Sequence, residues 1–99
     1  MNEQRPLVPA ILSTEDLHAH LALLPGWAVE GREIVKTYTF PTYLSGIKFV
    51  NSVAHQAEGM NHHPDLVVGW RKVTVRLTTH SAGGITELDL RLARFCEQC

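Results

Sequence analysis

The sequence predicts an α+β domain in which three helices pack on one face of a four-stranded antiparallel sheet, in the order αββαββα. In three segments apolar residues recur every three or four positions, as they do in a helix with one buried face. In four short segments apolar and polar residues alternate, and tight turns join these segments into two pairs, as in β-hairpins. With all helices on one face, the other face of the sheet stays available to a ligand or a partner chain.

The chain is expected to begin with an extended arm and a short helix. Pro6 and Pro9 disfavour helix, so residues 1–12 are predicted to be extended. The helix should begin at Ser13, whose hydroxyl can accept a hydrogen bond from the amide three residues further on, and should end before Pro25. The apolar residues expected on its buried face are Leu17, Leu21 and Leu24.

The first hairpin is predicted to pair residues 27–30 with residues 33–40, and the longest helix follows it. The second of these strands is rich in β-branched and aromatic residues, which favour strands. Helical periodicity returns after Pro41 and continues to about Met60, where Asn61 favours the end of the helix. The stripe predicted to be buried comprises Tyr43, Ile47, Val50, Ala54 and Ala57.

The second hairpin is predicted to pair residues 66–69 with residues 73–79, around a turn near Trp70. A glycine pair then interrupts the chain, and the segment Thr86–Asp89 resembles a capping box. A last helix is therefore expected to open there and to continue through Phe95.

The composition fits one domain over residues 13–99 and excludes several classes of protein. Nine Lys and Arg face ten Asp and Glu, scattered along the chain, which argues against binding to nucleic acid or to a membrane surface. No apolar run approaches the roughly 20 residues of a membrane helix and no signal peptide is recognisable, so a cytoplasmic protein is expected. Cys96 and Cys99 lack further ligands nearby and are interpreted as incidental thiols.

Three histidines, His62, His63 and His80, carry the candidate chemistry. Pro64 keeps His63 out of the helical region, so the adjacent pair is expected on a turn, with the two side chains pointing in different directions. Pairing of the last two strands places the start of one beside the end of the other, which should gather all three imidazoles around one cavity. Imidazole donates and accepts protons near neutral pH, so the cluster favours acid/base chemistry.

Polar side chains near the histidines can orient the imidazoles or hold polar ligand atoms: Glu58, Asn61, Thr78, Thr79, Ser81 and Asp89. From the residues alone, three interpretations stay open. The histidines cap and solvate a helix end and a strand end, or they transfer protons, or they bind zinc with one position left open. No metal is expected, because adjacent histidines seldom converge on one ion and His62, His63 and His80 show no His-x-His spacing among them.

The spacing of these residues resembles the signature of the pterin-4a-carbinolamine dehydratases. That signature is an acidic residue, three spacers, His-His-Pro, an aromatic residue after five more, then a histidine and finally an aspartate. The matching residues are Glu58, His62, His63, Pro64, Trp70, His80 and Asp89. The likeness covers about residues 12–95, with two departures: Leu66 replaces an aromatic residue that many members carry, and Leu88 replaces an arginine found in some.

The resemblance implies dehydration of a 4a-hydroxytetrahydropterin to the quinonoid dihydropterin, a hydro-lyase reaction without metal or organic cofactor. This step recycles tetrahydrobiopterin after an aromatic amino acid hydroxylase has used it. By similarity, His62 and His80 are expected to be the proton-transfer pair, and His63 is expected to orient the ring. The residues expected to bind the pterin or to set histidine tautomers are Glu58, Asn61, Thr78, Thr79 and Asp89.

Two other functions stay open at this point. One is a protein-binding module, because some relatives stabilise the dimerisation helices of a transcription factor, and the other is pterin handling in molybdenum-cofactor metabolism. The stripe from Tyr43 to Val50 is interpreted as core rather than as a docking surface. Exposed sheet edges also predict a homodimer by strand pairing, from which a homotetramer would follow by helix packing.

Overall fold

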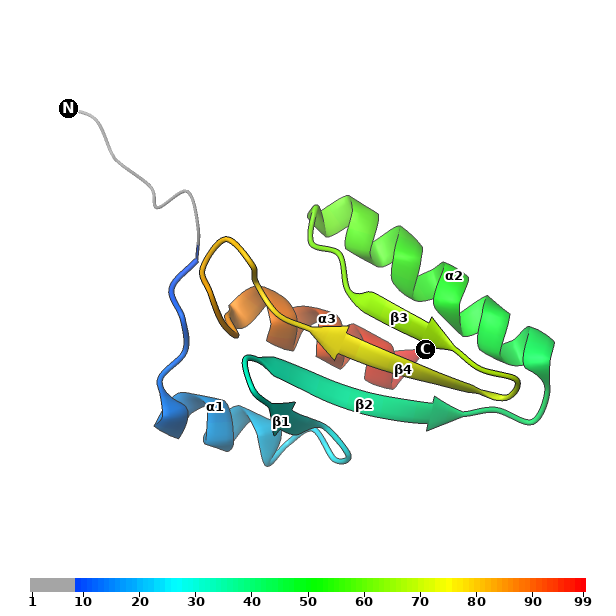
Figure 1. Cartoon of the computed structure of the whole chain (residues 1–99), viewed down its shortest axis with the longest axis horizontal. Coiled ribbons are helices and arrows are strands. Elements are labelled where there is room, and N and C mark those ends of the chain that lie inside the picture. The colour runs from blue at the N-terminus through cyan, green and yellow to red at the C-terminus, as the bar shows by residue number, and fades with distance from the viewer. Residues whose placement is uncertain (1–8) are drawn as a thin grey trace.

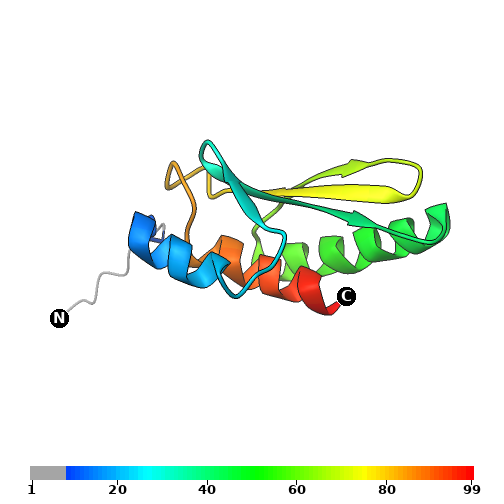
Figure 2. The same cartoon turned by 90° about the horizontal axis from the view of Figure 1, so that it is seen from below.

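The computed structural model describes residues 9–99, and within them it contains three helices and four strands (Figure 1). The sheet is antiparallel throughout, with the strand order β1-β2-β4-β3. All three helices lie on the same side of it (Figure 2), so the predicted fold class and element order are confirmed. The elements are α1 (Thr14–Leu21), β1 (Ala28–Glu30), β2 (Glu33–Thr39), α2 (Tyr43–Met60), β3 (Asp65–Val68), β4 (Lys72–Leu77) and α3 (Glu87–Gln98).

The core lies between the sheet and the helices, and the central strand β4 shows the pattern most clearly. Val73, Val75 and Leu77 are fully buried on the face that the helices cover, whereas Thr74 and Arg76 point to the other face and stay partly exposed. This alternation of period two is the geometry of a strand with one covered face. Burying each of these aliphatic side chains contributes about 1.5–3 kcal/mol, so β4 fixes the register of both neighbouring strands.

The predicted buried stripe of α2 is wrong in part. The side chains that face the core are Gly46, Phe49, Val53 and Ala57. Of the predicted stripe, only Ala57 is buried, Ile47 and Val50 are half-buried, and Tyr43 and Ala54 are exposed. Gly46 lies on the buried face, where a Cβ atom would lie 3.3 Å from the Phe40 ring. The absent side chain lets the first turns of α2 approach Phe40.

The helix ends follow the local sequence signals. The Ser13 hydroxyl accepts from the Asp16 amide at the start of α1, and Thr86 and Asp89 form a capping box at the start of α3, as predicted. Helix α1 ends at Leu21, earlier than Pro25 suggested, and is followed by turns in which Leu23 and Leu24 bond to carbonyls three residues back.

The predicted arm over residues 1–12 lies mostly outside the described residues. Its described end packs against the loop before α3, where the Leu12 amide donates to the Ile85 carbonyl at 2.9 Å. A Cβ atom on Gly84 would lie 3.4 Å from the Ile11 side chain, so this loop and the arm are in close contact.

Candidate functional site

The connections that carry the histidines meet at one end of the sheet (Figure 1). Asn61 adopts the left-handed conformation, with φ of 51°, and turns the chain out of α2. The His62 amide then donates to the Ala57 carbonyl, and β3 begins with Asp65 paired to Arg76 of β4. The α2–β3 turn therefore lies beside the end of β4, as the strand pairing predicted.

A buried hydrogen-bonded pair of His62 and Asp89 forms the centre of this region. His62 Nε2 lies 2.6 Å from Asp89 Oδ1, and the two residues are 8% and 0% exposed. The partners come from the α2–β3 turn and the first turn of α3, so 27 positions of chain separate them. A carboxylate placed without partners in this interior would cost several kcal/mol, so its other contacts determine whether the arrangement is stable.

Two more donors form hydrogen bonds with the Asp89 carboxylate. The Thr79 hydroxyl donates to Asp89 Oδ2 at 2.8 Å, and the Thr86 amide donates to the same oxygen at 2.9 Å. The Thr86 hydroxyl lies 2.8 Å from Thr79 Oγ1 and must donate to it, because the Thr79 proton is already used. The acceptor-only, ionised form of Asp89 satisfies all three donors, and the third of them is the N–H at His62 Nε2.

This hydrogen-bond pattern fixes the tautomer of neutral His62. With its proton on Nε2, the imidazole carries a lone pair on Nδ1. Nδ1 takes part in no hydrogen bond within residues 9–99, yet no buried side-chain polar atom in that range lacks a partner. Nδ1 is therefore not fully enclosed, and its lone pair is not used by any group within the described residues. The carboxylate behind the ring would stabilise the imidazolium that forms when Nδ1 accepts a proton.

His63 points away from this cluster, as its position next to His62 predicted. Its Nε2 atom lies 2.7 Å from Glu58 Oε1, and the two side chains are 57% and 80% exposed. An ion pair in this exposed setting adds little stability. It does hold the His63 ring beside the last turn of α2.

His80 lies on the surface in a hollow of about 290 Å³, lined also by Thr78, Arg32, Glu33 and Gly83. Thr79 faces the core and Asp89, whereas Thr78 and His80 line this hollow, as expected for residues that alternate along extended chain. The Thr78 hydroxyl donates to the Arg32 carbonyl at 2.6 Å and so holds the β1–β2 turn against the end of β4. His80 is thus adjacent in sequence to a residue that contacts Asp89.

The structure brings together some of the predicted site residues directly. His62, Thr79 and Asp89 share one hydrogen-bonded cluster, and His63 pairs with Glu58. Within residues 9–99, no hydrogen bond joins His80 to either of the other two histidines, so a single cavity shared by all three stays a prediction. The predicted ligand role of Asn61 likewise stays a prediction, since its backbone ends α2.

Sequence reasoning missed three residues of this region. Thr86 is predicted to cap a helix whose first amides add donors to the site, but the contact of its side-chain hydroxyl with Thr79 is not predicted. Arg32 and Glu33 were assigned to a turn and to a strand, although they line the hollow that contains His80. In the structure β2 pairs with β4, and Ile34 lies opposite Leu77. This pairing places the β1–β2 turn beside Thr78, so the two residues could have been found only by predicting that β2 and β4 are neighbours.

The described residues offer no arrangement for a metal ion. Within residues 9–99, no group of three or more His, Cys, Asp or Glu side chains is placed to bind one, so the zinc interpretation gains no support. Cys96 is buried and Cys99 is exposed, and neither is part of a disulfide. None of the helices in this part of the chain has the length and apolar character needed to span a bilayer.

Comparison with known proteins shows which family the chain resembles. A family model described as pterin 4 alpha carbinolamine dehydratase matches residues 10–99. The chain belongs to this family. The matched range includes every position of the histidine signature, so the family resemblance found in the sequence is confirmed.

Individual members of the family are similar over most of their length. A protein of Thermosynechococcus vestitus, named "Putative pterin-4-alpha-carbinolamine dehydratase", is 49% identical over 83 residues, which cover 84% of this chain and 87% of that protein. A protein of the same name from Mycobacteroides abscessus is 48% identical over 84 residues, covering 85% and 89% of the two chains.

Solved structures support the same fold. A transcriptional coactivator/pterin dehydratase from Brucella melitensis superposes with a TM-score of 0.85 at 33% identity, covering 89% of this chain and 96% of that one. A pterin dehydratase-like protein identified as a RuBisCO assembly factor in the α-carboxysome superposes with a TM-score of 0.59 at 19% identity, covering 73% and 83%. The second likeness concerns the fold alone.

Proposed function

We propose that this protein dehydrates a 4a-hydroxytetrahydropterin, such as 4a-hydroxytetrahydrobiopterin, to the quinonoid dihydropterin. The observation that carries the proposal is the buried His62–Asp89 pair, with Thr79 and Thr86 completing the carboxylate. A purely structural histidine does not need a buried carboxylate with further donors, since one hydrogen bond to any acceptor would satisfy its ring N–H. A general base does benefit from it, because a fixed tautomer and a nearby anion favour acceptance of a proton.

The reaction removes water across N5 and C4a of the pterin and needs one base and one acid. We assign the base to His62 Nδ1, which takes the proton from N5. The electron pair of the N5–H bond then forms the double bond between N5 and C4a, and the bond from C4a to the hydroxyl oxygen breaks. The departing hydroxyl accepts a proton and leaves as water.

The acid is assigned to His80, because its exposed side chain lines the hollow and no hydrogen bond within the described residues occupies its ring nitrogens. After one turnover His62 carries the extra proton and His80 lacks one, and exchange with solvent restores both. His63 and Glu58 would orient the pterin ring, and Thr78 would contact it at the same hollow as His80. Asp89 acts through His62 as a positioning residue.

A stopped-flow assay of 4a-hydroxytetrahydropterin loss tests this proposal. We expect His62→Ala and His80→Ala each to lower kcat by about 100-fold or more, as for the loss of an acid or a base. His55→Ala is the matched control, because His55 is an exposed histidine on α2 outside the site, and its rate should equal that of the wild type. A wild-type rate no faster than the spontaneous reaction would reject the enzymatic assignment. Full activity in both site variants would reject the roles given to the two histidines.

The proposal also includes the metabolic role, the location and the oligomeric state of the protein. Dehydration would recycle the pterin cofactor of an aromatic amino acid hydroxylase in the cytoplasm. We further propose a homodimer formed through the edge strand β3, where Val67 and Val68 are 59% and 41% exposed beside unpaired backbone groups.

A protein-binding role is the second candidate, and an exposed apolar face of α2 supports it. Tyr43 and Leu44 are 48% and 73% exposed, contrary to the expectation that this side of the helix is core. The related Brucella structure carries the name transcriptional coactivator as well as pterin dehydratase. A dedicated binding module would keep its partner in the His80→Ala variant and would have no turnover to lose.

A further inference from the structure

A second hollow lies at the opposite end of the sheet from the histidines. Its volume is about 420 Å³, and it is lined by Thr39, Phe40, Trp70, Arg71 and Lys72. Lys72 begins β4, whereas His80 follows the end of that strand. Five steps of about 3.3 Å along extended chain put the two ends of β4 roughly 17 Å apart. The proposed dehydratase site therefore does not account for this hollow.

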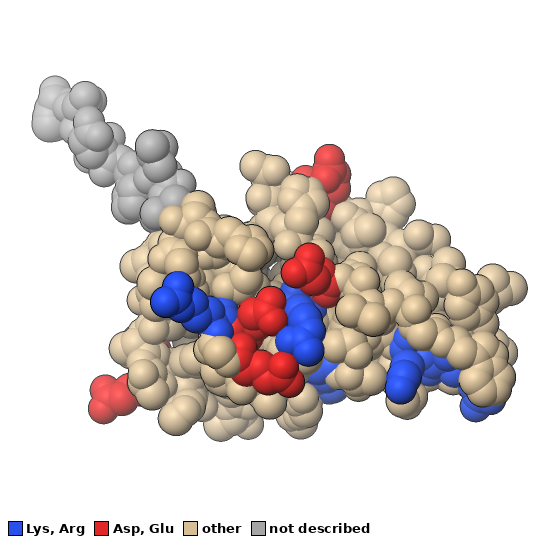
Figure 3. Space-filling model, viewed as in Figure 1, with Lys and Arg blue, Asp and Glu red and all other residues tan. Residues whose placement is uncertain are grey.

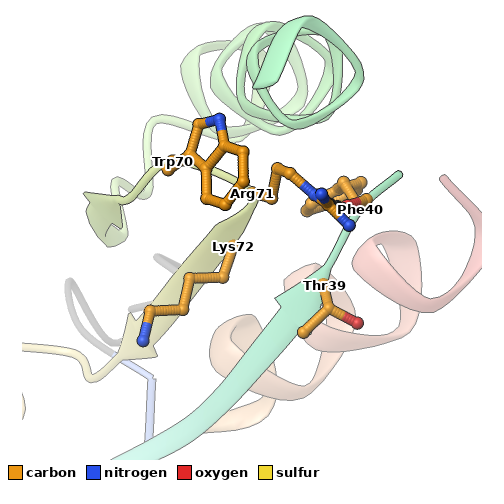
Figure 4. A pocket seen from close by; sticks show the side chains of 5 residues that line it. All are labelled: Thr39, Phe40, Trp70, Arg71 and Lys72. Carbon is orange, nitrogen blue, oxygen red and sulfur yellow. Dashed lines mark hydrogen bonds between the residues drawn. The ribbon is translucent and has the colours of Figure 1, made fainter. Parts of the chain in front are cut away.

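Two aromatic rings form the walls of the hollow. The Trp70 side chain is 73% exposed in the β3–β4 turn. Phe40 is half-buried and rests against Phe49, with 5.2 Å between ring centroids. Figure 4 shows Trp70 and Phe40 on different sides of the hollow, with the Arg71 side chain extending toward Phe40. An exposed tryptophan beside a second ring is a surface suited to stacking a flat ligand.

Arg71 is held in a fixed position beside these rings. Its Nε atom donates to the Phe40 carbonyl at 3.2 Å, and its guanidinium carbon lies 4.8 Å from the centre of the Trp70 ring. Neither terminal nitrogen of Arg71 has a partner within residues 9–99. A guanidinium fixed at one edge and free at the other is prepared to bind a carboxylate with little loss of side-chain entropy.

The charge around the hollow has one sign. Arg71 and Lys72 carry two positive charges, no acidic residue lines the hollow, and neither cation forms a salt bridge within the described residues. Figure 3 shows Lys and Arg atoms at this end of the molecule without Asp or Glu atoms beside them on the face in view. A bound anion would therefore meet attraction without a competing carboxylate.

We propose that this hollow binds a small aromatic carboxylate, with its ring against Trp70 and Phe40 and its carboxylate on the free edge of the Arg71 guanidinium, while Lys72 adds positive charge to the same lining. The volume falls within the range of small-molecule sites, about 300–1,000 Å³. The absence of an acidic group in the lining disfavours an aromatic amino acid, because its ammonium group would find no acceptor there and would meet two cations. The site selects an aromatic acid without an amine.

Titration with 2-naphthoate, followed by NMR at the Trp70 indole N–H, tests this site in the intact chain. For a ligand of this size in an open hollow we expect a dissociation constant on the order of 1 mM or tighter. Arg71→Gln should weaken binding about tenfold or more, because it removes a charged hydrogen-bond donor. Lys48→Gln makes the same charge change at an exposed lysine outside this hollow and should leave the affinity unchanged.

Two reference ligands separate the contributions of ring and charge. The neutral 2-naphthylmethanol and the non-aromatic cyclohexanecarboxylate should each bind at least tenfold more weakly than 2-naphthoate. Equal binding of 2-naphthoate and its neutral analogue, or unchanged affinity in the Arg71→Gln variant, would overturn the proposal. So would an acidic peptide with one phenylalanine that binds at Trp70 more than tenfold more tightly than 2-naphthoate, since the hollow would then be a docking surface for a protein. Dehydratase activity is not a readout here, so failure of either proposal leaves the other intact.

Discussion

Replacement of Asp89 by asparagine changes the charge of the buried cluster without changing its shape. The amide oxygen of the new side chain would take the place of Oδ2, because the Thr79 hydroxyl and the Thr86 amide both donate there. The amide NH₂ would then face His62 Nε2, which can no longer donate a proton toward it. His62 must move its proton to Nδ1, and this removes the lone pair assigned to the base.

The size of both effects follows from these contacts. The wrong tautomer and the missing anion should lower kcat by about 10²–10⁴-fold, the range for a general base that loses its carboxylate partner. Stability should fall by about 2–3 kcal/mol, because three charge-assisted hydrogen bonds become neutral ones and the first turn of α3 loses a negative charge. A domain of this size is usually stable by about 5–15 kcal/mol, so the variant should stay folded.

Three measurements test this prediction: stopped-flow dehydration, urea unfolding, and the ¹⁵N shifts of the His62 ring. Asp65→Asn provides the control, because Asp65 is an exposed aspartate at the start of β3 and should change neither activity nor tautomer. The reasoning is refuted if Asp89→Asn keeps full activity. It is also refuted if the His62 proton stays on Nε2 while activity falls.

Two further predictions concern the thiols and the sheet edge. Burial raises the pKa of Cys96 to about 12, whereas Cys99 is exposed. At pH 8 a disulfide reagent should therefore react with one thiol in the native protein and with two in urea. Rapid reaction of both thiols in the native protein would contradict this prediction. Val67→Lys should convert the proposed homodimer to monomer in light scattering, whereas Val29→Lys on the opposite edge strand β1 should not; the reverse result would move the interface to β1.

Much of the fold could be predicted from the sequence because local signals and tertiary contacts agree. Ser13 and Thr86 stand where a side-chain acceptor favours the start of a helix, and both act as caps. In β4 the alternation of Val73, Val75 and Leu77 with polar residues matches burial without exception. Each of these signals depends on the residue itself and its near neighbours in the chain, so each can be recognised before any contact is known.

The buried face of α2 could not be predicted in the same way, because a glycine forms part of it. Periodicity counts apolar side chains, so it favoured the stripe of Tyr43, Ile47 and Val50 and gave Gly46 no weight. In the structure Gly46 lies on the buried face, and the missing side chain leaves room for the Phe40 ring there. Close packing at a glycine depends on a residue from another element, here the end of β2.

The candidate site shows the same division between local and distant information. The spacing of His62, His80 and Asp89 along the chain could be recognised as a family signature, but spacing does not contain the distance between side chains. The structure adds that Asp89 holds His62 while it caps α3, so one carboxylate serves both a helix end and a candidate base. Any substitution of Asp89 therefore changes stability and activity together. A substitution of Thr79 would separate the effect on stability from the effect on activity more clearly. It removes a donor to Asp89 Oδ2 and leaves the hydrogen bond between Asp89 Oδ1 and His62 in place.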